Sequence, residues 1–196
     1  MYKYFFKRVI DIIIGLVALP FVLLVIICLA PFIYFTDRGP IFYNAIRVGK
    51  DYKPFKMFKL RSMYVNAPDI RNADGSTFNS DNDPRVTPIG RIMRKTSLDE
   101  FPQFLNVLIG DMSFIGPRPS TPKIFEENIT ITMKKHFDVK PGITGYTQAY
   151  YRNSIEKEKR YELDAYYSKN VSFCLDFKIL LKSIMTVILS RNIYKN

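Results

Sequence analysis

The feature that most constrains this chain is a 24-residue apolar run, Ile12–Phe35, which contains no charged side chain. A helix of about 20 apolar residues is long enough to cross the hydrocarbon core of a bilayer. The run is too long for a secretory signal, and no obvious small-residue cleavage site follows it. The sequence therefore predicts a membrane helix near the beginning of the chain.

Basic residues on both sides of this run decide its expected path. Lys3, Lys7 and Arg8 precede it, and six more follow: Arg38, Arg47, Lys50, Lys53, Lys56 and Lys59. Positive flanks favour the cytoplasm, so a straight span would place one of them on the wrong side. Pro20 and Pro31 lie within the run and can each bend a helix. A re-entrant helix with both ends in the cytoplasm satisfies both flanks, whereas an ordinary single span remains the alternative.

A second segment, Thr96–Pro119, places two adjacent carboxylates, Asp99 and Glu100, at the expected start of an amphipathic helix. Apolar side chains follow at the spacing of one helical face: Phe101, Phe104, Leu105 and Leu108. At the N-terminus of a helix, the backbone dipole favours anionic groups and phosphates held by a metal.

Two starting points for this helix fit the sequence. Ser97 and Glu100 have the spacing of a capping box. Alternatively, Asp99 is the N-cap, which places Pro102 in the first turn, where its missing N–H does no harm. Gly110 is expected to end the helix.

Cationic side chains surround the acidic pair in the sequence. Arg91, Arg94 and Lys95 precede it, and the Gly116–Pro119 turn contributes Arg118. Two carboxylates among cations suggest a phosphoryl-transfer site with a divalent metal, in which Arg or Lys balances the transferring group. The plain alternative is that the two carboxylates only cap a helix.

These segments closely resemble the core of the bacterial sugar transferases, the monotopic phosphoglycosyl transferases, and the size of the chain is most similar to their small members. The resemblance covers nearly the whole chain, because further matching blocks lie at Phe55–Met63, Asp83–Glu100, Lys140–Asn153 and Tyr161–Asn170. It implies transfer of a sugar-1-phosphate from a UDP-sugar to polyprenyl (undecaprenyl) phosphate, with release of UMP.

The same resemblance implies roles for individual residues. Asp99 would be the nucleophile and form an aspartyl phosphosugar intermediate, and Asp99 and Glu100 would hold Mg²⁺. Substrate contacts are expected from Lys59, Arg61, Arg94, Arg118, Gln148, Arg152, Asn153 and Asp164.

Three departures from the family pattern stand out. Pro20 lies one helical turn before the usual Ser-Pro break, which falls at Leu23–Leu24. Ala45 replaces a common glutamine, and Thr147–Tyr151 replaces a common Ala-Gln-Val-Asn-Gly, so sugar preference does not carry over from relatives.

The net charge of +11 suits an anionic partner, and membrane lipid is expected here in preference to nucleic acid. Cys28 and Cys174 form no disulfide framework, which fits a reducing compartment. His136 lies in a basic run and is expected at the surface. Two rival functions stay open: a non-catalytic, membrane-anchored basic binding module, and a glycosyl transferase that moves only the sugar and releases UDP.

The expected fold is mainly α with a few short β-strands (α+β), in a monotopic membrane protein. Residues 1–38 form the re-entrant helix, and residues 39–196 form the cytoplasmic catalytic domain on the membrane surface, within one folding unit. Helices are expected at Ile124–Phe137, Ile155–Lys169 and Phe173–Leu189, the last lying at the membrane interface. Asp51–Met63 is strand-like and Val65–Asp83 a surface loop. The expected location is the cytoplasmic face of the bacterial inner membrane, and a homodimer is left open.

Overall fold

The computed structural model describes residues 1–70, 78, 80, 82–126, 129–151 and 155–188, and this part of the chain is mainly helical with a few short strands, as predicted. The helices are α1 (Lys7–Asp37), α2 (Pro88–Thr96), α3 (Gln103–Ile109), α4 (Ile131–His136), α5 (Tyr146–Tyr150), α6 (Lys157–Lys169) and α7 (Phe173–Ile188). The strands are β1 (Ala45–Val48), β2 (Pro54–Met57), β3 (Ser113–Ile115) and β4 (Gly142–Thr144). β1 and β2 form an antiparallel pair, and β3 and β4 a parallel one.

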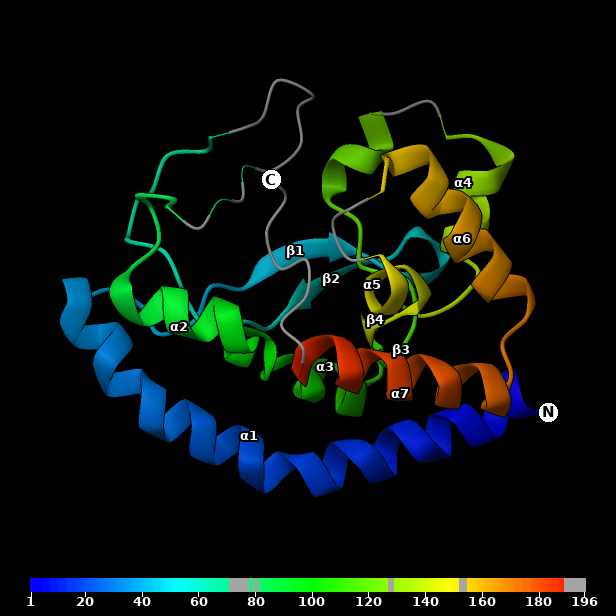
Figure 1. The fold of residues 1–196 in the computed structure, drawn as a ribbon, viewed down its shortest axis with the longest axis horizontal. Helices are drawn as coiled ribbons and strands as arrows, with labels where there is room; N and C mark the ends of the chain where they lie inside the picture. The colour runs from blue at the N-terminus through cyan, green and yellow to red at the C-terminus, as the bar shows by residue number, and fades with distance from the viewer. Residues whose placement is uncertain (71–77, 79, 81, 127–128, 152–154, 189–196) are drawn as a thin grey trace.

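The apolar run forms α1, a single long helix that follows a curved path along one side of the molecule (Figure 1). Together with a π-helical turn, Tyr2–Phe6, it forms a stretch long and apolar enough to cross a membrane. The helix continues through Pro20 and Pro31 without a break. Both of its ends lie against the rest of the molecule, because Lys7 pairs with Asp176 of α7 and Asp37 pairs with Arg61, each at 2.6 Å.

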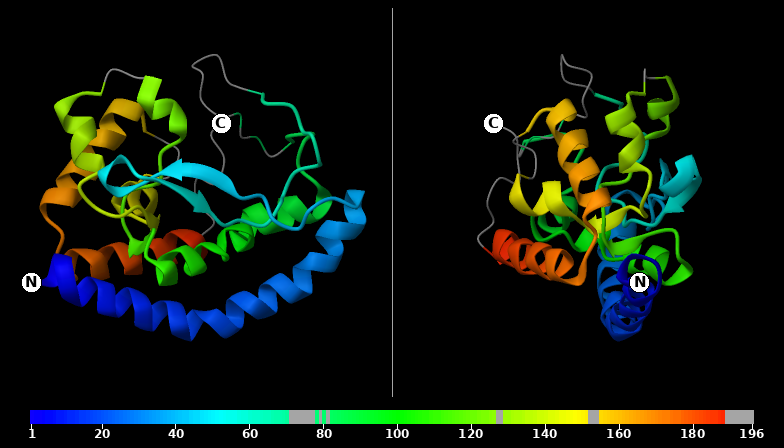
Figure 2. Two further views of the ribbon diagram at one scale, coloured as in Figure 1. Left: turned by 180° about the vertical axis from the view of Figure 1, so that it is seen from behind. Right: turned by 90° about the vertical axis from the view of Figure 1, so that its right-hand side faces the viewer.

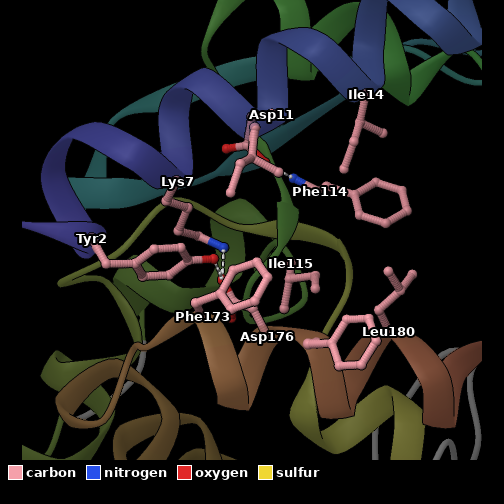
Figure 3. Close-up of a pocket in the computed structure, with 11 residues that line it drawn as sticks. Tyr2, Lys7, Asp11, Ile14, Phe114, Ile115, Phe173, Asp176 and Leu180 are labelled. Atoms are coloured by element: carbon pink, nitrogen blue, oxygen red, sulfur yellow. Dashed lines mark hydrogen bonds and ion pairs between the residues drawn. The ribbon is translucent and has the colours of Figure 1, made fainter.

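Polar contacts fasten the first half of α1 to α3 and β3. Arg8 donates to the carbonyl oxygens of Val107 and Leu108. These oxygens lie in the last turn of α3, where carbonyl groups have no N–H partner within the helix. Asp11, although it lies in an apolar helix, is buried and accepts from the Phe114 N–H at 2.8 Å (Figure 3). These contacts make α1 part of the fold rather than a separate anchor.

One face of α1 remains exposed and apolar, with side chains that include Leu16, Val17, Leu24 and Ile27. α7 lies on the same side of the molecule (Figure 2) and exposes a further apolar stripe: Phe173, Phe177, Leu181, Ile184 and Met185. The spacing of this stripe fits one helical face, as expected for a helix at a membrane interface.

Two buried apolar clusters support the segment between β2 and α2. Ile33, Leu60 and Met93 pack together and join α1, α2 and the segment after β2. Met57, Val107 and Met112 form a second cluster that joins β2 to α3. Lys59 lies between these clusters in the sequence, so packing on both sides fixes its backbone.

Several element boundaries differ from the expected ones. The strand-like stretch Asp51–Met63 contains β2 only at Pro54–Met57, and the helix expected at Ile124–Phe137 is divided into a 3₁₀ turn, Pro122–Glu126, and α4. α6 and α7 match their expected positions closely. Much of the Val65–Asp83 loop lies outside the described residues.

Candidate active site

The acidic pair lies in a 3₁₀ turn, Leu98–Glu100, between α2 and α3. Ser97 ends α2 in a left-handed conformation, with φ of +58°, and this turns the chain away from the axis of α2. α3 begins only at Gln103, after Pro102, and ends at Gly110, whose φ is +105°. The end at Gly110 confirms the prediction.

Both predicted starts of this helix are wrong. The Ser97 side chain makes no capping hydrogen bond, because Ser97 is the C-cap of α2 and its backbone is in the left-handed conformation. Asp99 is not the N-cap of α3, because a turn separates it from the first helical residue. The two carboxylates are therefore held by tertiary contacts rather than by a helix terminus.

Lys59 bridges the two carboxylates. Its Nζ lies 2.8 Å from Oδ2 of Asp99 and 3.4 Å from Oε1 of Glu100. Asp99 is buried, with 2% of its surface exposed, and its carbonyl oxygen accepts from the Leu60 N–H at 2.9 Å. A buried carboxylate needs such a partner, because an unpaired charge is costly away from water.

Asn106 was missed as part of this site. It is completely buried in α3, accepts from the Phe58 N–H at 2.8 Å and donates to the Lys56 carbonyl at 2.8 Å. It thereby holds the backbone on both sides of Met57 and supports the segment that carries Lys59. The sequence does carry a sign of this role, because Asn106 is a polar residue in the middle of an apolar helical run.

Arg118 is a second cation close to the acidic pair. Its side chain is 56% exposed, and its Nη2 lies 3.8 Å from Oε1 of Glu100. Burial of Glu100 raises the pKa of its carboxyl, but the charges of Lys59 and Arg118 outweigh this and hold that pKa below its usual range. Glu100 is therefore an anion at neutral pH.

Close backbone packing sets the position of the turn that carries Arg118. Gly116 donates to the carbonyl of Thr144, and the Gly142 N–H donates to the carbonyl of Pro117. A Cβ at Gly145 would collide with the Gly116 carbonyl oxygen, so only glycine allows this approach. The parallel pairing of β3 with β4 thus brings the Gly116–Pro119 turn beside α5.

The donor set suits a metal ion that also binds substrate phosphates. Within the ranges that the structure describes, no three His, Cys, Asp or Glu side chains lie together. Mg²⁺ is commonly held by one or two carboxylates and completed by substrate phosphates and water. Asp99 and Glu100 fit that role, and a complete cage of protein ligands is not required.

Two predicted phosphate-binding arginines have protein partners. All five N–H groups of Arg61 are used by Asp37 and by the carbonyl oxygens of Ile33, Pro40 and Met63. Arg61 therefore fastens the end of α1 and is not brought to the acidic pair. Arg94, in the last turn of α2, is half-buried and donates from Nε to the Ser62 hydroxyl at 3.0 Å.

The remaining predicted contacts divide into three cases. Gln148 carries a buried Oε1 without a hydrogen-bond partner among the described residues, and its Nε2 donates to the Ile143 carbonyl oxygen. Asp164 is 1% exposed, and its two oxygens are bound by His136 and Thr147. Arg152 and Asn153 lie outside the described residues.

The prediction that His136 lies at the surface is wrong. Its exposed fraction is 5%, and its Nδ1 lies 2.9 Å from Oδ2 of Asp164. The basic run that suggested exposure belongs to α4, whose inner side packs against α6. His136 lies on that inner side, where Asp164 of α6 pairs with it.

Comparison with known proteins identifies relatives of this chain. A family model described as bacterial sugar transferase matches residues 2–190. The chain is 38% identical, over 94% of its length, to a UDP-N-acetylgalactosamine-undecaprenyl-phosphate N-acetylgalactosaminephosphotransferase of Aeromonas hydrophila, and spans 44% of that protein. It is 37% identical, over 96% of its length, to a UDP-glucose:undecaprenyl-phosphate glucose-1-phosphate transferase of Escherichia coli K12, and spans 41% of it. It is also 41% identical, over 79% of its length, to the uncharacterized sugar transferase EpsL of Bacillus subtilis, and covers 73% of that chain.

Proposed function

The chain belongs to the bacterial sugar transferase family, and from this premise we propose that it transfers a sugar-1-phosphate from a UDP-sugar to polyprenyl phosphate. The matched relatives from A. hydrophila and E. coli are named as enzymes of this kind, acting on undecaprenyl phosphate. The products would be UMP and a polyprenyl-diphosphate sugar.

The observation that carries the proposal is the pair of carboxylates bridged by Lys59 and faced by Arg118. Two cations beside an acidic pair suit a diphosphate, whose negative charge they offset. A non-catalytic binding module would not explain why a carboxylate is buried at Asp99. The arrangement instead supplies a nucleophile, an anion that can hold a metal, and a charge that stabilises the transition state.

In the first step Asp99 acts as the nucleophile. A carboxylate oxygen forms a bond to the phosphorus that carries the sugar, and the bond from this phosphorus to the bridging oxygen breaks. UMP departs with the bonding electrons, and the phosphosugar remains on Asp99. Lys59 keeps the Asp99 carboxylate oriented beforehand through the 2.8 Å ion pair.

In the second step an oxygen of polyprenyl phosphate attacks the same phosphorus, and the bond to the Asp99 carboxylate breaks. The free carboxylate returns to its pairing with Lys59. The exposed Arg118 would bind the phosphate oxygens in both steps, and Gln148 would contact the nucleotide sugar.

Magnesium is part of the proposal. Asp99 and Glu100 would hold Mg²⁺, which when bound neutralises diphosphate charge and makes UMP a better leaving group. The ionised state of Glu100, maintained by Lys59 and Arg118, suits this role.

We further propose that the protein is monotopic, with α1 re-entering the cytoplasmic face of the inner membrane. Three features support this path: the exposed apolar faces of α1 and α7, the basic flanks of α1, and the attachment of both ends of α1 to one domain. A straight span would separate those ends by the thickness of the bilayer.

The test is UMP release from a panel of UDP-sugars, with Mg²⁺ and undecaprenyl phosphate in detergent. We expect UMP from at least one sugar, and complete loss in Asp99→Asn, because an amide is a far poorer nucleophile. Mass spectrometry without acceptor should find the phosphosugar on Asp99. Release of UDP would favour a glycosyl transferase, and near-normal UMP release by Asp99→Asn would exclude the covalent mechanism.

A further inference from the structure

Four polar side chains from separate parts of the fold form one hydrogen-bonded series, called here the Ser120 relay. Ser120 Oγ lies 3.3 Å from Nε2 of His136, whose Nδ1 lies 2.9 Å from Oδ2 of Asp164. Thr147 donates its hydroxyl to Oδ1 of the same carboxylate at 3.1 Å. His136, Asp164 and Thr147 are 5%, 1% and 2% exposed, so the series runs through the interior.

The relay uses every polar atom of its two buried members. A carboxylate oxygen accepts hydrogen bonds, so Oδ1 of Asp164 accepts from the Thr147 hydroxyl, and Oδ2 faces Nδ1 of His136. On its other side the His136 ring places Nε2 within hydrogen-bond distance of the Ser120 hydroxyl. Both carboxylate oxygens and both ring nitrogens therefore have a partner, and such networks hold their members rigidly.

The relay joins the two segments that carry candidate substrate contacts. Ser120 follows Arg118 by two residues, and its backbone is held by Val48 through hydrogen bonds of 2.9 and 3.2 Å. Thr147 directly precedes Gln148 in α5. The buried His136–Asp164 pair therefore connects the turn that carries Arg118 to the helix that carries Gln148.

We propose that His136 is a positioning residue of the transfer reaction, which through Ser120 fixes the turn that carries Arg118. Among the described residues, the exposed Arg118 side chain forms one ion pair, the 3.8 Å contact with Glu100, so its place depends on the backbone that carries it. Misplacing a catalytic group by about 1 Å can lower a rate about a hundredfold. This inference rests on the proposed function, since it concerns the alignment of Arg118 with the transferring phosphate.

The deciding experiment is a double-mutant cycle between Ser120→Ala and Arg118→Ala, measured as UMP release. Ser120→Ala removes one half-buried hydroxyl and keeps both backbone bonds to Val48, so we expect an unchanged melting temperature by circular dichroism. We expect kcat to fall about tenfold with an unchanged KM for the UDP-sugar. In the Arg118→Ala background the same change should have no further effect, because the group that it positions is gone.

Two more variants complete the design. Thr121→Ala removes a hydroxyl from the next residue, which is exposed, and should retain full activity. His136→Asn keeps a donor for Asp164 but cannot reach Ser120. It should therefore lower kcat as much as Ser120→Ala does, and the two changes together should lower kcat no further. Unreduced activity of Ser120→Ala, or additive losses in the cycle, would overturn the inference. Failure of the unmodified protein to release UMP from any UDP-sugar would instead refute the proposed function, and the inference with it.

Discussion

At the scale of single residues, charge and burial divide the arginines into two groups. Arg61 gives every N–H group to protein acceptors, whereas Arg118 is exposed and, within the described part of the chain, pairs with Glu100 alone. The family pattern alone makes both arginines phosphate ligands. Their surroundings assign one to anchoring the fold and leave the other available to substrate.

We predict that Arg118→Ala lowers the rate of UMP release far more than Arg38→Ala does. An arginine that stabilises a transferring phosphoryl group can contribute on the order of a thousandfold in rate. Arg38, exposed at the end of α1, would contribute only about 1 kcal/mol of attraction to anionic lipid. Comparison of kcat/KM for the two variants checks this, and equal losses would mean that the Gly116–Pro119 turn is only structural.

A second residue-scale prediction concerns pH. Asp83 is buried, and its hydrogen bonds from the Arg85 guanidinium hold the pKa of its carboxyl below the value of 3.8 for an unperturbed Asp. The resulting stability is fully present above about pH 4 and is lost as the pH falls through the lower folded-state pKa.

Denaturant unfolding at pH 5 and pH 3 checks the effect. We expect Asp83→Asn to be less stable at pH 5 by about 3 kcal/mol, because Arg85 loses its buried partner. The deficit should shrink at pH 3, because below about pH 3.8 the carboxyl becomes protonated in the unfolded chain, which lowers the stability of the unmodified protein. Asp138→Asn, which removes an exposed carboxyl paired with Lys135, serves as the control with little change. A deficit that stays constant with pH would contradict the prediction.

At the scale of elements, α1 depends on contacts with segments distant in the sequence. Arg8 meets α3, Asp11 meets β3, and Asp37 meets Arg61 after β2. An apolar helix that contains a buried Asp is stable in lipid only when that side chain is paired.

Arg61→Met tests the anchoring of α1. Removing one partner of a buried, bidentate pair costs about 3 kcal/mol, which lowers the melting temperature by roughly 6–12 °C in a chain of this size. Arg61→Lys should lose most of the same stability, because an ammonium cannot copy the two parallel bonds to Asp37. Circular dichroism in detergent measures this, and an unchanged melting temperature in Arg61→Met would argue against the anchoring role.

The sequence predicts an element well when the element depends on a local pattern, and less well when it depends on contacts with residues far away in the sequence. The apolar run, the end of α3 at Gly110, and α6 follow from periodicity and glycine chemistry. The 3₁₀ turn of the acidic pair does not, because it depends on the left-handed Ser97 and on the Leu60 N–H that binds the Asp99 carbonyl. Likewise, burial of His136 and Asp164 arises from a contact between α4 and α6 that no local pattern encodes.

At the scale of the whole molecule, the two ends of the curved helix α1 meet opposite ends of one domain (Figure 1). A domain on one side of a bilayer then requires both ends of the helix on that side. We predict cytoplasmic exposure of both ends.

Single cysteines at Tyr4 and Lys53, in a background where Cys28 and Cys174 are serine, provide the test. Tyr4 and Lys53 are exposed and lie before and after α1. In intact cells an impermeant thiol reagent should label neither site, and after lysis it should label both. Labelling of either one in intact cells would support an ordinary span.

The contacts of Arg8 and Asp11 also impose an order on biogenesis. Both residues are among the first to be synthesised, yet their partners at Val107, Leu108 and Phe114 follow about a hundred residues later. Until the ribosome has added that stretch, α1 carries a guanidinium and a carboxylate with no native partner. We therefore expect α1 to reach its final contacts only after α3 and β3 have been synthesised, so that docking of α1 onto the domain is a late step of folding.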